Sequence, residues 1–155
     1  SVVDICNSAL NLLGASTISA LTDDTKNARL CNQRYEPVRN RIFRSHPWNC
    51  LIKRVQLAKD SAAPVIEFSN QYTLPTDYLV YVALDTDPNN YDVYVQESIS
   101  HQLAADIAYA VTNNATLANN YMARADERLR EARFIDATEN SIDTLEANEF
   151  TDARL

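Results

Sequence analysis

The sequence predicts a mainly α-helical protein of the α+β class, a bundle of about four helices with a small antiparallel β extension and a C-terminal tail. Toward both ends of the chain, apolar residues recur at spacings of three and four, which is the period of an amphipathic helix. Between about residues 51 and 97, β-branched and aromatic residues form short runs separated by turn signals, as strands do. We therefore expect one folded domain over residues 1–135 and an acidic tail over 136–155.

Two helices are expected near the N-terminus, over residues 1–13 and about 23–45. Gly14 directly follows the first, and glycine readily adopts the left-handed conformation that ends a helix. Pro37 lies inside the second and lacks the N–H that would bond the carbonyl of Gln33. The sequence therefore predicts either a kink or a break at Pro37.

A corner is expected where the second helix ends, at His46, Pro47 and Trp48. An imidazole at a helix C-terminus interacts well with free carbonyls, so His46 is predicted to cap the helix. Trp48 is expected to be buried and to anchor the turn into the first strand, although a lone tryptophan also stacks on bases and sugars.

The β extension is expected to contain runs of strand at 51–58, 64–74, 79–85 and 91–97. Tyrosines are concentrated there, among them Tyr91 and Tyr94. Tyrosine is frequent in protein interfaces, and strand propensity accounts for part of the same enrichment.

Helices are expected again at about 98–112 and 115–135, where the apolar period returns. Residues 136–155 lose that period and carry six acidic residues against one arginine, which predicts an acidic tail with scattered apolar anchors. The anchors are Ile142, Leu145, Phe150 and Leu155.

Several functional classes are excluded by composition. Gly14 is the only glycine, so a P-loop, a dinucleotide-binding G-x-G-x-x-G and a nucleophile elbow are absent. Three distant cysteines without C-x-x-C and two isolated histidines predict free thiols and no metal site. We expect no catalytic residue and no cofactor. No apolar run approaches the roughly 18 residues of a membrane span, so we expect no membrane association and synthesis in the cytoplasm.

Positive charge is concentrated in residues 26–54, which hold eight of the fourteen basic residues and one acid, Glu36, in a chain of net charge −7. This segment either contacts nucleic-acid phosphates or pairs with acidic groups of the same chain or of a neighbouring subunit. An acidic protein repels DNA at long range, so we favour pairing with protein. The residues expected at a subunit interface are Arg34, Arg39, Arg41 and Arg44.

Three motifs resemble a known family. They are "DDTKNAR" at 23–29, the pattern R-x-x-R-S-H-P-W-N at 41–49, and Y-x-L-P-x-D-x-L at 72–79. In this order they resemble the head-to-tail adaptor family of tailed bacteriophages, in particular the tubular tail protein A and head-completion proteins of short-tailed phages. The resemblance covers about residues 3–135, and the last 20 residues carry no motif of the family.

The resemblance implies a virion protein at the head–tail junction, assembled as a homo-oligomeric ring, usually of twelve copies, below the portal. Such a ring extends the DNA channel, lets the genome pass without specific binding, and presents a surface to the next tail or nozzle component. Tyr91 and Tyr94, in the tyrosine-rich β extension, are the residues that we expect to contact that tail component. The four apolar anchors of the C-terminal tail would dock against the portal.

Two alternatives from other classes remain at the level of sequence. A soluble DNA-binding factor would use the basic segment 26–54 and bind duplex DNA with a steep salt dependence. A cell-wall hydrolase would need a pair of carboxylates, but no spacing in the sequence indicates which ones.

Overall fold

The computed structural model describes residues 1–56 and 78–139. These residues form four α-helices and one two-stranded antiparallel sheet, which confirms the predicted mainly α fold with a small β extension. The elements are α1 Val2–Leu12, α2 Lys26–Arg44, β1 Ile52–Gln56, β2 Tyr78–Val82, α3 Val93–Thr112 and α4 Ala115–Glu139. Short 3₁₀ helices at Asn49–Leu51 and Pro88–Asn90 precede β1 and α3.

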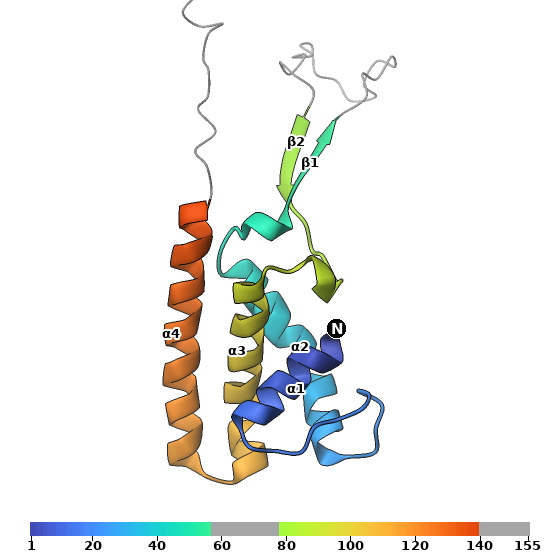
Figure 1. Cartoon of the computed structure of the whole chain (residues 1–155), viewed down its shortest axis with the longest axis vertical. Coiled ribbons are helices and arrows are strands. Elements are labelled where there is room, and N and C mark those ends of the chain that lie inside the picture. The colour runs from blue at the N-terminus through green and yellow to red at the C-terminus, as the bar shows by residue number, and fades with distance from the viewer. Residues whose placement is uncertain (57–77, 140–155) are drawn as a thin grey trace, which may run out of the picture.

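Helix α3 is the centre of the bundle and packs against α1, α2 and α4 (Figure 1). Its core-facing residues, including Ile99, Leu103 and Ile107, are fully buried. Helix α4 packs mainly on α3 and runs antiparallel to it, so most of the surface of α4 faces solvent.

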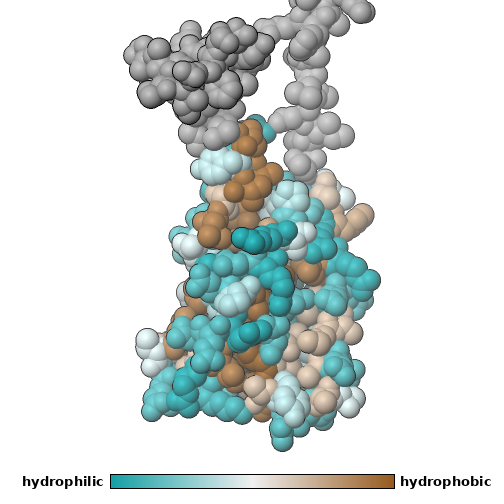
Figure 2. All heavy atoms as spheres, turned by 180° about the vertical axis from the view of Figure 1, so that it is seen from behind, coloured by the Kyte–Doolittle hydropathy of each residue, from teal (hydrophilic) through white to brown (hydrophobic). Residues whose placement is uncertain are grey.

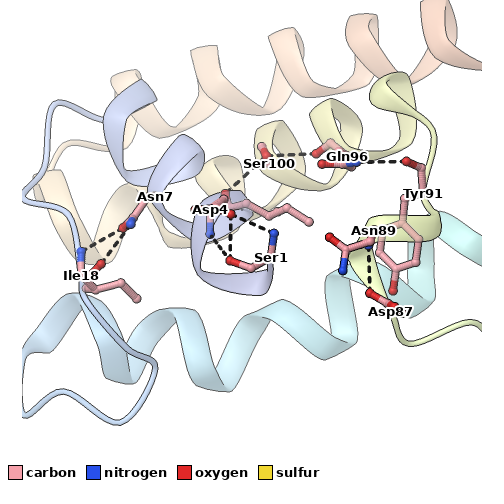
Figure 3. Close-up of polar contacts among 10 residues, drawn as sticks. Ser1, Asp4, Asn7, Ile18, Asp87, Asn89, Tyr91, Gln96 and Ser100 are labelled. Atoms are coloured by element: carbon pink, nitrogen blue, oxygen red, sulfur yellow. Dashed lines mark hydrogen bonds and ion pairs between the residues drawn. The ribbon is translucent and has the colours of Figure 1, made fainter.

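Helix α1 begins and ends through local hydrogen bonds that the sequence encodes. The Ser1 hydroxyl and the Asp4 carboxylate form a reciprocal capping box at the start (Figure 3). At the end, Gly14 has φ +67°, and the N–H of Ala15 bonds the carbonyl of Leu10 at 3.0 Å. This is the Schellman arrangement, which requires a left-handed residue and so explains the single glycine.

Helix α2 is one continuous helix through Pro37, so of the two predicted outcomes, a kink or a break, the break does not occur. Proline removes the donor for the carbonyl of Gln33, but both residues are exposed, so water is able to satisfy that carbonyl. Thr25 caps the start of the helix by accepting a hydrogen bond from the N–H of Ala28 at 3.1 Å.

Trp48 is fully buried, as predicted, and anchors the end of α2. Its indole Nε1–H donates to the carbonyl of Ile42 at 2.9 Å, and its ring lies edge-on to His46 at a centroid distance of 4.9 Å. The cysteines are free, as predicted, and Cys6 and Cys31 are buried in the core. A hydrogen bond to Cys31 and burial both raise the pKa of the Cys6 thiol.

The β extension is smaller than predicted. The strand expected at 51–58 appears as β1 over 52–56, and that at 79–85 appears as β2 over 78–82. They pair in the register Ile52 with Val82 and Arg54 with Val80. The run at 64–74 lies outside the described residues.

The strand predicted at 91–97 was wrong, because α3 begins at Val93 rather than at about residue 98. The Asp92 carboxylate accepts from the N–H of Tyr94 at 2.8 Å and starts the helix. Val95 and Ile99 then lie four residues apart on one buried face. Burial of that face outweighs the strand propensity of "VYV". Helix α4 also runs four residues beyond its predicted end, to Glu139.

Candidate functional site

The positive charge of α2 is largely paired within the chain. Asp106 of α3, whose side chain is 10% exposed, accepts from Arg34 Nη2 at 2.5 Å and from Arg41 Nη2 at 2.9 Å. Arg34 and Arg41 are seven residues apart, two helical turns, and therefore reach the same carboxylate from one face of α2. The sequence did not show whether the acidic partner of these arginines belongs to the same chain or to a neighbour. For Arg34 and Arg41 it belongs to the same chain.

This polar contact continues across the bundle to α4. Arg41 Nη2 also donates to Gln102 Oε1 at 3.3 Å, and Gln102 Nε2 donates to Asp126 Oδ1 at 3.2 Å. Gln102 is largely buried, and unpaired polar groups there would be costly. The network therefore fixes how α2 and α4 sit on α3.

Arg39 lies inside the molecule, which contradicts its prediction as an exposed interface residue. Its side chain is 8% exposed. Its guanidinium donates to Asn40 Oδ1 at 3.0 Å and to Glu36 Oε1 at 3.4 Å, and lies 5.9 Å from the centre of the Tyr35 ring. Arg39 thus stabilises α2 at the edge of the core through contacts within its own helix.

Of the four predicted interface arginines, Arg44 alone is both exposed and without a polar partner among the described residues. Other basic residues of the segment are also paired: Arg29 with Asp24 at 2.5 Å, Lys53 with Asp85 at 3.4 Å, and Lys26 with the carbonyl of Ala110. Helix α2 therefore offers one free guanidinium on its outer face.

The charge of the whole chain divides unevenly. The described residues carry twelve basic and fourteen acidic side chains, a net charge of −2. The remaining two basic and seven acidic side chains belong to 57–77 and 140–155. The acidic excess therefore belongs mostly to residues that the structure does not describe.

The corner after α2 is tied to the C-terminal end of α4. Asp136 is buried, and its carboxylate accepts from His46 Nε2 at 2.9 Å and from the N–H of Asn49 at 3.0 Å. Asn49 Nδ2 donates to the carbonyl of Asp136 at 2.7 Å. Residues 136–139 thus belong to the folded unit, although the sequence placed them in the tail.

The prediction that His46 caps α2 is wrong. Ser45 does so, with its hydroxyl donating to the carbonyl of Ile42 at 2.6 Å. His46 instead points to Asp136, 90 residues away in sequence. No local pattern around His46 or Asp136 in the sequence predicts this contact.

A groove lies between α1 and α4, with α3 as its floor. Its volume is about 740 Å³, and its lining includes Ile5 of α1, Arg128 of α4 and Glu97 and His101 of α3. Asp4 lies on its α1 side, and Ser100 donates to the carbonyls of Ile5 and Gln96 on its floor (Figure 3). The sequence analysis did not identify this groove, because its residues come from three helices.

Burial and the nearby guanidinium of Arg128 lower the pKa of His101 below its ordinary value of 6.5. The imidazole is therefore neutral near pH 7. Arg128 is paired with Glu131 at 2.7 Å. Glu97 is exposed and has no hydrogen-bond or ion-pair partner among the described residues, so the groove offers an unpaired carboxylate beside α3.

The β1–β2 ribbon carries exposed apolar side chains. Val80, Tyr81 and Val82 are 56%, 42% and 53% exposed, and Leu84 just beyond them is 64% exposed. Figure 2 shows a hydrophobic patch at this end of the described structure. A two-stranded ribbon is marginal on its own in water, so this surface suits contact with another protein.

The two tyrosines predicted to contact the tail are placed differently. Tyr94 lies in α3 and is 37% exposed, whereas Tyr91 is buried. Tyr91 packs edge-on against Phe43 at 5.1 Å between ring centres and donates from its hydroxyl to the carbonyl of Asp85. Tyr91 therefore holds the loop before α3 against α2.

The predicted portal-binding anchors, Ile142, Leu145, Phe150 and Leu155, lie outside the described residues. Within residues 1–56 and 78–139, no cluster of three histidine, cysteine or acidic side chains is placed to hold a metal ion. Among the described helices, none is long and apolar enough to cross a bilayer.

Comparison with known proteins adds no relative. No family model matches the sequence, and no curated protein matches it.

Proposed function

We propose that this protein is a structural component of a phage virion that forms an adaptor ring between portal and tail. The ring extends the DNA channel and docks the next tail component, and the genome passes through its lumen without specific binding. The proposal has no catalytic residue, cofactor or membrane contact. It starts from the resemblance of residues 23–29, 41–49 and 72–79 to that family.

The observation that carries the proposal is the exposed apolar ribbon. The ribbon and the C-terminal end of α4 lie at the same end of the bundle (Figure 1). Asp136 ties the end of α4 to the corner from which the ribbon starts. The ribbon and the C-terminal end of α4 are thus held together at one end of the bundle, an arrangement that suits a protein with two partners.

The arginine pairing favours this proposal over a DNA-binding factor. Such a factor would use Arg39, Arg41 and Arg44, but Arg39 is buried and Arg41 is bound to Asp106. One free guanidinium on this face is a poor phosphate-binding surface, because several contacts are needed for useful affinity.

The first experiment mixes the purified chain with the portal protein of its phage and measures complex mass and shape. We expect a ring of many copies with wild type, and a reduced yield with Val82→Lys, because a charge replaces an exposed apolar contact. Glu127→Lys is the control, since Glu127 is exposed on the outer side of α4 with no partner among the described residues. Equal yields for both variants would contradict the role of the ribbon.

A chain that ends after Glu139 tests the predicted portal anchors while leaving the Asp136 contacts intact. We expect this chain to fold normally and to lose portal binding. A gel-shift titration of wild type with duplex DNA at low salt tests the alternative: tight binding that weakens steeply with salt would support a DNA-binding factor and overturn the adaptor proposal.

A further inference from the structure

We propose that the groove between α1 and α4 binds the outer face of α2 of a second copy, with Arg44 of one copy facing Glu97 of the next. This inference rests on the proposed function and names the contact between neighbouring subunits of the ring. Its basis is one juxtaposition: a groove with a free carboxylate on one side of the bundle, and a free guanidinium on the opposite side.

The groove has the size and chemistry of a protein contact. Its volume is about 740 Å³, more than a single ion requires. Val93 lies at one end of the groove and is 62% exposed, and Ile5 and Leu12 add apolar lining. A mixed apolar and polar lining of this kind fits the side chains of a helix better than it fits a small anion or cation.

The charges of the two surfaces are complementary. In the groove, His101 is neutral and Arg128 is already paired with Glu131, which leaves Glu97 as an exposed carboxylate without a partner in the described part of the chain. On α2, Arg44 is exposed and equally unpaired. Arg44 borders a shallow depression of about 540 Å³ with Pro37, Asn40 and Arg41.

The two surfaces lie on opposite sides of the bundle. Arg34 and Arg41 place α2 beside Asp106 of α3, whereas Glu97 and His101 of α3 line the groove. At about 100° per residue, these two sides of α3 are roughly 160° apart. Two different surfaces that face apart cannot pair in a two-fold dimer, so their contact is head-to-tail and repeats from copy to copy.

Cysteine cross-linking tests the contact directly. The background is Cys50→Ser, because Cys50 is half-buried while Cys6 and Cys31 are fully buried. In this background, Arg44→Cys with Glu97→Cys in one chain should give a ladder of covalent multimers with a short bis-maleimide. A mixture of the two single variants should stop at dimers, and each single variant alone should remain monomeric.

The control places the second cysteine at another exposed acid, Glu127, and leaves Glu97 unchanged. Arg44→Cys with Glu127→Cys should give no ladder, because Glu127 lies on α4 outside the groove lining. Charge reversal gives a second readout. Arg44→Glu and Glu97→Arg should each lower self-association, and the double variant should restore it.

Each outcome separates the contact from the adaptor function. The contact is overturned if the Arg44/Glu97 pair gives no ladder with or without portal protein, if it stops at dimers, or if the Glu127 control gives the same ladder. If one of these results is found and the wild-type protein still binds the portal, the adaptor proposal is unaffected. A ladder from a chain that never binds the portal supports the contact and removes the adaptor function.

Discussion

At the scale of single residues, Asp136 joins two parts of the chain that are far apart in sequence. It is buried at the end of α4, and one carboxylate accepts from an imidazole and a backbone N–H of a corner 87 to 90 residues earlier. Buried donors left without an acceptor cost more than an ordinary hydrogen bond contributes. The position of the α4 end relative to the ribbon therefore depends on this side chain.

We expect Asp136→Ala to lower the free energy of unfolding by about 2 kcal/mol, because the Asn49 N–H and His46 lose their acceptor. Urea denaturation followed by circular dichroism measures this change. Glu139→Ala, one turn nearer the end of α4 and exposed, is the control and should leave the midpoint unchanged. Equal midpoints for the two variants would show that the corner is held by other contacts.

A second residue-level prediction concerns pH. Because burial lowers the pKa of His101 below 6.5, the unfolded chain takes up this proton more readily than the folded chain. The contribution of the neutral imidazole to stability is therefore fully present above the unfolded value of 6.5 and is lost progressively as pH falls toward the folded pKa. We expect His101→Gln to lose less stability than wild type between about pH 7 and pH 5. Parallel urea midpoints for both proteins over this range would contradict the assignment.

At the scale of elements, α4 is held by a narrow stripe. Ala125 and Ala132 are its fully buried alanines, and α3, on which α4 packs, also has buried alanines, Ala105 and Ala108. Small side chains let two helices approach closely, and there is little space in such an interface for added volume. The remaining surface of α4 is left open, which is why grooves form beside it.

We expect Ala125→Leu to destabilise the protein by about 1–3 kcal/mol, because the added methylenes push α4 away from α3. Ala123→Leu adds the same atoms at an exposed position of the same helix and should change stability by less than about 0.5 kcal/mol. Thermal unfolding of the two variants measures the difference, and a similar cost at both positions would argue against close packing of the helix pair.

At the scale of the whole molecule, the basic residues of segment 26–54 are balanced mainly by acidic residues of the same chain. The basic segment that stands out in the sequence is paired with Asp24, Glu36, Asp85 and Asp106. The described residues are nearly neutral, and the acidic excess belongs to 57–77 and 140–155. Only a few charges of the described residues, Arg44 and Glu97 among them, are left without a partner in the described part of the chain.

The pairing of Asp106 connects this charge balance to stability. We expect Asp106→Asn to lower the free energy of unfolding by about 1 kcal/mol at low salt, because Arg34 and Arg41 lose a shared anion. Both arginines are about half exposed, so the loss should shrink at high salt. Urea titrations at two salt concentrations measure the effect, with Glu127→Gln as the control. A salt-independent loss would indicate altered packing instead.

Local features were predictable because their causes lie within a few residues. The single glycine indicated the end of α1, and the apolar period indicated four helices. Trp48 was correctly predicted to be buried. Two wrong predictions share a cause: Tyr91 and Arg39 were assigned to contacts with other proteins from residue type and charge, whereas both are buried against other parts of the same chain. The role predicted for Tyr94, which is 37% exposed, stays a prediction.

By itself, the sequence determined the mainly helical class, the place of the β extension and the concentration of basic residues between 26 and 54. Periodicity and composition are properties of short segments, so they survive without knowledge of the fold. Only the tertiary structure decided that Asp106 pairs with α2, that Asp136 anchors the corner, and that Glu97 and Arg44, on opposite sides, have no partner among the described residues. Those outcomes depend on which residues distant in sequence become neighbours, and a local pattern does not encode that.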